Sequence, residues 1–244
     1  MFVFTFYERT VDLKRTMHYY RYVDDLNHNK TFYSDLLITN NEAPLDANQV
    51  NLHFSLIDQH SADIVANEND PMNRFMRGMD FYLVQDFSNA ISDYTQCILV
   101  DDTFFPAYFM RAIVRFKQYE YQAAENQAQQ PSTPSMGQLR VDKMETMDYT
   151  LVRKDLDKVI ELAPDFVYGY YNRACLFTQM KEYRSAIADY DKAIEMKPDF
   201  AEAYYNRGLT NIFLGNNRQG IADLSKAGEL GIASAYNVIK RFTE

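Results

Sequence analysis

The side chains best suited to acid–base chemistry or metal binding are four histidines, His18, His28, His53 and His60, in a chain of 244 residues. A zinc site needs three or four such ligands brought to one point. His53 and His60 are seven residues apart, so they share a face if their segment is helical, but no third ligand stands near them in the sequence. Such a pair is more often a surface or core feature. We therefore predict no metal and no cofactor.

Motifs for other catalytic mechanisms are missing from the sequence. It contains no glycine-rich phosphate loop, no H-E-x-x-H zinc motif and no serine nucleophile elbow. The acidic pairs Asp24-Asp25 and Asp101-Asp102 are most simply explained as solvated charges or turn formers. We expect the protein not to be an enzyme.

The charge balance argues against a nucleic-acid partner. Acidic residues outnumber basic ones by 34 to 25, the net charge is -9, and the basic residues form no cluster that would attract a phosphate backbone. The two cysteines, Cys97 and Cys175, fit neither a disulfide framework nor paired metal-ligand spacing. Reduced thiols favour a cytoplasmic location, or a periplasmic or exported one if a leader has been removed.

Targeting and membrane segments are not expected either. The apolar start, residues 1–7, is interrupted at once by Glu8 and Arg9 and lacks the features of a secretory signal. No apolar run approaches the roughly 20 residues that span a bilayer.

An internal repeat organises the second half of the chain. Residues 200–208 (FAEAYYNRG) echo residues 166–174 (FVYGYYNRA) at an offset of 34, and residues 220–224 (GIADL) echo residues 186–190 (AIADY) at the same offset. Earlier, Arg77-Gly78 and residues 90–94 (AISDY) keep this internal spacing. The pattern resembles the tetratricopeptide repeat (TPR) family, whose 34-residue unit implies two antiparallel helices.

The residue types explain the repeat physically. Small residues recur where two helices must lie close together, and a larger side chain would force them apart. Pro164 and Pro198 each follow a helical stretch and would end it. The recurring small residues are Gly78, Ala112, Ala174 and Gly208, then Ala90, Ala186 and Gly220, and then Ala193 and Ala227.

One arginine and one aspartate recur in each unit as an expected structural pair. The pairs are Arg77 with Asp93, Arg111 with Asp155, Arg173 with Asp189, and Arg207 with Asp223. Three pairs are 16 residues apart and the other is 44 apart, which indicates a 28-residue insertion between Tyr119 and Tyr149. Its centre, residues 126–137, contains two prolines and predicts a loop, followed by a long helix over residues 138–162. The insertion is either a functional loop or a tolerated surface excursion.

We therefore predict an all-α fold, a right-handed superhelical α-solenoid of antiparallel helix pairs. Its units are residues 71–104, 105–166, 167–200 and 201–234, followed by a capping helix over residues 235–244. Residues 1–70 would form a helical N-terminal extension, in which residues 57–70 resemble the second helix of a degenerate repeat. Residues 2–7 alternate like a strand, residues 8–27 suggest a helix, and Asp46 is placed to cap a helix that runs to about residue 67.

The resemblance to TPR proteins implies that the first helix of each unit lines a concave groove that takes an extended or helical peptide. The implied partner-binding residues are Phe75, Met76, Tyr82, Phe109, Met110, Phe116, Tyr171, Asn172, Tyr205 and Asn206. Core packing is an alternative for several of them and is favoured for Met79, Ile113, Cys175 and Leu209. Phe75 and Met79 stand where a carboxylate clamp for a terminal peptide would need lysine and asparagine, which argues against that kind of ligand.

The predicted function is therefore that of a scaffold or adaptor that binds a protein or peptide of unknown identity. The chain's own N-terminal segment, residues 1–45, or a second copy could occupy the apolar groove. The alternatives are an architectural subunit of a larger assembly, a self-associating oligomer and, more remotely, an accessory subunit of an enzyme.

Overall fold

The computed structural model describes residues 46–128 and 149–243, and all of these belong to one compact unit. Every regular element in these two ranges is a helix, as the sequence predicts. The ten helices are α4 (Ala47–Ala66), α5 (Pro71–Leu83), α6 (Phe87–Val100), α7 (Phe105–Ala128), α8 (Thr150–Leu162), α9 (Val167–Gln179), α10 (Tyr183–Met196), α11 (Ala201–Phe213), α12 (Asn217–Glu229) and α13 (Ser234–Thr243).

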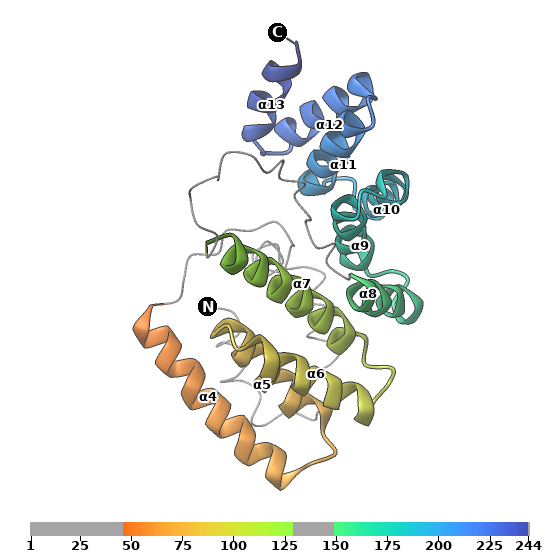
Figure 1. Ribbon diagram of the computed structural model, residues 1–244. Coiled ribbons are helices and arrows are strands. Elements are labelled where there is room, and N and C mark those ends of the chain that lie inside the picture. The colour runs from red at the N-terminus through yellow and green to blue at the C-terminus, as the bar shows by residue number, and fades with distance from the viewer. Residues whose placement is uncertain (1–45, 129–148, 244) are drawn as a thin grey trace, which may run out of the picture. The chain divides into compact units, whose positions relative to one another are not determined.

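Each helix packs mainly on the helices that precede and follow it in the chain (Figure 1). The tightest contacts join α5 to α6, α7 to α8, α9 to α10 and α11 to α12, and each of these pairs also packs on the next. A fold in which each unit contacts chiefly its neighbours is a helical-repeat solenoid. The predicted all-α repeat fold is therefore confirmed.

The turn inside a helix pair has the same geometry in three pairs. Gln85, Lys181 and Gly215 all have positive φ angles, of 63°, 61° and 82°. The next residue in each turn donates its backbone N–H back to the carbonyl five residues earlier, at 2.8 Å. This pattern closes a helix C-terminus and suits glycine, because a side chain in the left-handed region costs roughly 1–2 kcal/mol. The turns at Gln85 and Lys181 therefore carry a strain that the turn at Gly215 avoids.

Small residues set the distance between paired helices, as their spacing predicted. In the pair of α11 and α12, a Cβ atom added to Gly220 would lie 2.7 Å from the carbonyl oxygen of Gly208 and 2.6 Å from Cγ1 of Ile212. Ala174 and Ala186 occupy the same positions in the preceding pair and are fully buried. The helices of the last pair thus approach too closely for even a methyl group at Gly220.

The predicted cap at Asp46 is confirmed. Its carboxylate accepts hydrogen bonds from the backbone N–H groups of Asn48 and Gln49, at 2.8 and 2.9 Å, and the Gln49 side chain accepts one from the Asp46 N–H in return. This reciprocal capping box fixes the start of α4. Helix α4 then packs on α5 and buries Leu56 and Ile57.

The prediction for the insertion was wrong at both of its described ends. The longest helix is the first of its pair, α7, which continues to Ala128, where a loop was predicted from residue 126. The second helix, α8, begins at Thr150 rather than near residue 138. Alanine, glutamine and glutamate favour helix, so the sequence beyond Tyr121 extends α7. Residues 129–148 and the elements predicted within residues 1–45 lie outside the described residues.

The last helix, α13, packs on α12. Ala235 joins Leu224 and Ala227 in a small buried cluster, with Val238 and Ile239 partly buried against it. None of the described helices is both long and apolar enough to cross a membrane.

Candidate protein-binding surface

The structure buries most of the residues that the sequence assigned to a groove, so these residues present no open surface in it. The buried residues are Phe75, Tyr82, Phe109, Met110, Phe116, Tyr171 and Asn172. Met76, Tyr205 and Asn206 retain partial exposure. The predicted surface is therefore divided between interior positions on α5, α7 and α9 and accessible positions that concentrate on α11.

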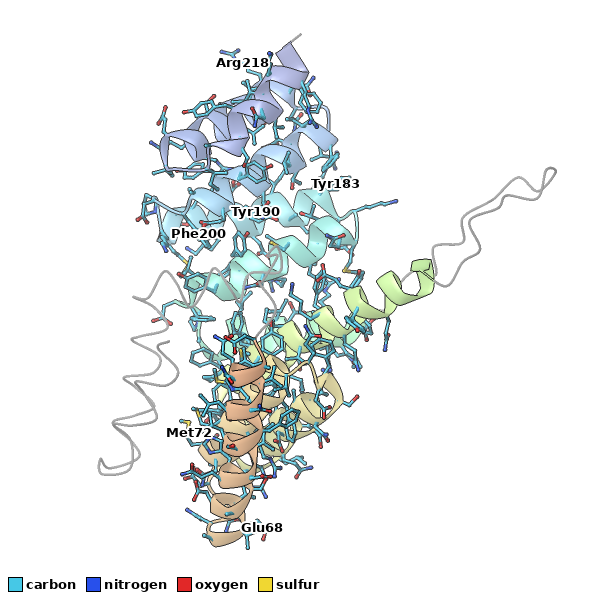
Figure 2. All side chains as sticks on the ribbon, turned by 90° about the vertical axis from the view of Figure 1, so that its left-hand side faces the viewer. Glu68, Met72, Tyr183, Tyr190, Phe200 and Arg218 are labelled. Carbon is cyan, nitrogen blue, oxygen red and sulfur yellow. The ribbon has the colours of Figure 1, made fainter. Side chains whose placement is uncertain are left out.

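An aromatic residue at the end of each of the first three units packs on one of these buried rings. Phe104 packs edge-on against Phe75, with ring centroids 5.3 Å apart, and Phe166 packs edge-on against Phe109 at 5.1 Å. Phe200, labelled in Figure 2, packs on Tyr171 at 4.7 Å. We call Phe104, Phe166 and Phe200 the closing rings. Each packs on the aromatic ring that the sequence assigned to the groove.

The fourth unit lacks this closing ring because it ends at Ser234. Tyr205, which occupies the position of Phe75, Phe109 and Tyr171, therefore keeps a partly exposed ring. The signal was readable in the sequence as a phenylalanine at the last position of three units and a serine in the fourth.

Five accessible residues of α11 form one strip, which we call the open α11 face: Tyr205, Asn206, Leu209, Ile212 and Phe213. They follow each other at helical spacing, so they lie on one side of the helix. The first four are partly buried, and Phe213 is 65% exposed. The strip combines apolar and aromatic side chains with a single amide.

That amide is held in place by the preceding unit. The Asn206 Nδ2 group donates a hydrogen bond to the Tyr171 hydroxyl at 2.7 Å and contacts the Cys175 Sγ atom at 3.7 Å. The Tyr190 hydroxyl also donates to Cys175, and Thr178 lies 3.4 Å from Thr210 across the same joint. The polar groups of the preceding unit therefore hold the Asn206 side chain in one orientation.

Burial controls the titration of the groups behind the face. It raises the pKa of the Cys175 thiol to about 11 and raises the pKa of Tyr190 well above its ordinary value. Burial likewise raises the pKa of the Cys97 thiol, which donates to the Pro71 carbonyl. Both cysteines are thus neutral thiols that pack as small apolar side chains.

The structure brings together all four arginine–aspartate pairs. In each pair the arginine Nε and Nη2 groups donate to the two carboxylate oxygens, at distances from 2.6 to 3.0 Å, as for Arg173 with Asp189 and Arg111 with Asp155. The aspartate side chains are only 4–11% exposed, so these pairs are more than surface contacts. Hydrogen bonding to its aspartate raises the pKa of Arg173.

The same arginines also bond backward, to the preceding unit, which sequence reasoning missed. Each Nη1 group donates to a side chain 16 residues earlier, so one guanidinium joins three helices. These acceptors are Ser61 for Arg77 at 3.0 Å, Thr95 for Arg111 at 3.1 Å, Asp157 for Arg173 at 2.8 Å and Asp191 for Arg207 at 2.6 Å. The constant offset of 16 was the available signal.

The histidine pair on α4 lies inside the protein. His53 and His60 do share a helix face, as predicted, and both face the carboxylate of Asp80 on α5. Asp80 is 27 residues beyond His53, and no sequence pattern pointed to the contact. In the described residues, no group of three or more histidine, cysteine, aspartate and glutamate side chains is arranged to hold a metal ion.

This stack of helix pairs, joined by arginine clamps and carrying an aromatic strip, defines a helical-repeat protein of the kind that presents an extended binding surface. Comparison with known families gives the type of repeat. The family described as "TPR repeat" matches residues 175–215, and the family described as "Tetratricopeptide repeat" matches residues 201–230. Residues 175–230 therefore match tetratricopeptide repeats.

Solved structures share the fold. One described as "Crystal structure of MamA" has a TM-score of 0.57 and 20% identity, over 74% of this chain and 89% of that chain. TTC0263, a thermophilic TPR protein in Thermus thermophilus, has a TM-score of 0.53 and 14% identity, over 80% and 96% of the two chains. At these identities the likeness concerns the fold. No curated protein sequence matches the chain.

Proposed function

We propose that the protein is an interaction scaffold that binds a peptide segment of another protein on the open α11 face. The observation that carries the proposal is the exposure of Tyr205 and Asn206 at positions where the preceding unit buries Tyr171 and Asn172. The repeat fold supports a scaffold in general, because stacked repeats present extended surfaces to partners.

The chemistry of the face indicates the kind of segment that it takes. Tyr205, Leu209 and Phe213 offer apolar and aromatic contact area, and aromatic side chains commonly anchor interfaces. The Asn206 Nδ2 group is engaged internally, while no contact within the described residues uses the side-chain oxygen Oδ1. That oxygen can accept a backbone N–H of the ligand. We infer a segment with two or more apolar anchors and an accessible backbone N–H between them.

The test is a selection of displayed random peptides on the immobilised full chain, followed by calorimetric titration of the peptides obtained. We expect peptides with apolar or aromatic anchors, and at least tenfold weaker binding to a Tyr205→Ala/Leu209→Ala variant. The matched control is Leu99→Ala, because Leu99 is a 73% exposed apolar residue on α6. Equal loss in both variants, or no loss in the α11 variant, would place the binding surface elsewhere.

A second candidate function, self-association or membership of a larger assembly, is favoured by α13. Tyr236 and Phe242 on this helix are 52% and 49% exposed, so two aromatic side chains are available there for contact with another chain. Light scattering after size exclusion measures the mass of the particle. A concentration-independent monomer that Tyr236→Ser/Phe242→Ser leaves unchanged would exclude self-association through α13.

A further inference from the structure

The first and last helices of the described stack, α4 and α13, each expose one side (Figure 1). In the described part of the chain, α4 packs mainly on α5 and α13 packs mainly on α12. The exposed side of α4 carries Gln59 and also Leu52, which is 42% exposed. That of α13 carries Arg241 and also Phe242, which is 49% exposed. Both helices thus offer apolar and polar side chains for contact.

The contacts of α4 give it the register of the second helix of a unit. Ser61 accepts the backward bond of Arg77, just as Thr95 on α6 accepts that of the next repeat arginine. On α6 the paired aspartate, Asp93, stands two residues before this acceptor, and α8 and α10 keep the same spacing. On α4 the matching position is Gln59, which is exposed and bonds no arginine within the described residues.

The sequence gives α13 the register of the first helix of a unit. Arg241 stands 34 residues beyond Arg207, as Arg207 stands 34 beyond Arg173. Arg207 donates its Nε and Nη2 groups to Asp223 on the second helix of its unit. Arg241 is exposed, and no hydrogen bond or ion pair within the described residues engages it. α13 therefore carries an arginine at the pairing position, and α4 carries a side-chain acceptor at the matching one.

We propose that the protein associates end to end, with α13 of one copy packed against α4 of the next, so that the two helices complete one repeat unit. Arg241 of one copy then donates to the Oε1 atom of Gln59 on the other copy. The inference rests on the second candidate function, self-association through α13, and supplies the surface that α13 meets.

The charges of the two helices are complementary. α13 carries Lys240 and Arg241 and no acidic residue, while α4 carries Asp58 and Asp63 and no lysine or arginine. Complementary charges steer two surfaces together, and like charges oppose the pairing of α13 with α13 or of α4 with α4. The charges therefore favour contact between opposite ends of two copies.

The residues at the closest approach indicate a wider spacing than in the internal pairs. Phe242 stands where the first helices of the other units carry glycine or alanine, and Leu56 stands where α6, α10 and α12 carry alanine or glycine. Side chains of this size hold two helices further apart. Gln59 is longer than an aspartate by a methylene group, so it spans more of this distance to the arginine.

The test is sedimentation velocity of the full chain over a wide range of concentration. We expect the particle mass to rise with concentration without reaching a fixed number of copies, because a junction between two different surfaces leaves one of each free. Gln59→Arg and Arg241→Glu each place like charges at the junction, so each should weaken association at least tenfold. Mixed in equal amounts, the two variants should associate with wild-type affinity, because one keeps the native α13 and the other keeps the native α4.

The matched controls are Gln96→Arg on α6 and Arg218→Glu on α12, which make the same changes at exposed positions on other helices and should associate as the wild type does. A wild-type chain that stays monomeric at every concentration would overturn both this inference and self-association as a function. Association that weakens in Tyr236→Ser/Phe242→Ser but not in Gln59→Arg would keep self-association and overturn the pairing of α13 with α4. An equal loss in the controls would trace the effect to net charge and would also refute the pairing.

Discussion

Replacing Arg173 with alanine should destabilise the protein by about 3 kcal/mol, because it removes one clamp between three helices. Arg173 donates two hydrogen bonds to Asp189, at 2.7 and 2.9 Å, and one to Asp157 at 2.8 Å. Asp189 is 11% exposed, so it would be left as a largely buried charge without its partner, a loss of about 3–5 kcal/mol when burial is complete. Asp157 is 46% exposed, so the loss of its hydrogen bond with Arg173 should contribute about 1 kcal/mol or less to the destabilisation.

Urea unfolding followed by far-ultraviolet circular dichroism measures this loss. Asp157→Ala should cost about 1 kcal/mol or less, and Arg173→Lys should fall between wild type and Arg173→Ala, because lysine keeps the charge but not the two-pronged geometry. The matched control is Lys192→Ala, which breaks an exposed pair with Glu195 and should change stability by less than about 0.5 kcal/mol. A loss in Arg173→Ala no larger than in Lys192→Ala would refute the clamp reasoning.

Three other predictions concern the repeat geometry and its thiols. Lys181→Gly should raise the free energy of unfolding in urea by about 0.5–1 kcal/mol, because glycine adopts the positive φ angle of this position without strain. Gly215→Lys should lower it for the same reason. A less stable Lys181→Gly variant together with a more stable Gly215→Lys variant would show that the turn is unstrained. Gly220→Ala should lower the free energy of unfolding by about 1–3 kcal/mol in the same assay, because the methyl group of alanine would meet the backbone of α11. An unchanged free energy of unfolding would mean that the two helices can move apart freely. At pH 8 a disulfide reagent should label Cys175 roughly 100-fold more slowly in the native than in the urea-unfolded chain, because burial raises its pKa to about 11; equal rates would contradict its burial.

Much of the fold was readable from the sequence because it repeats. An offset of 34 residues identified the helix pairs, and glycine or alanine at the close approaches fixed which faces meet. The arginine and aspartate of each pair could be matched by their spacing even across the insertion, as for Arg111 and Asp155. These features are periodic, so each unit supports the interpretation of the others.

The candidate surface was predicted less well because exposure depends on residues outside the helix considered. Assigning Phe75 and Tyr171 to a groove ignored the closing rings of Phe104 and Phe200, which come from the end of the unit. The contact between His60 and Asp80 joins two helices without a periodic signal. The extent of α7 was missed because the polar sequence from residue 126 onward, with its two prolines, predicted a loop where α7 continues to Ala128.

The backward bonds of the arginines differ along the chain in a way that affects mechanics. At the N-terminal joints the acceptor is a neutral hydroxyl, Ser61 or Thr95, while at the C-terminal joints it is a carboxylate, Asp157 or Asp191, that is about half exposed. Dissolved salt screens attraction between exposed charges and hardly affects a bond to a hydroxyl. Rising ionic strength would therefore loosen the last joints first, and the end that carries the open α11 face would bend more freely while the N-terminal joints stay stiff.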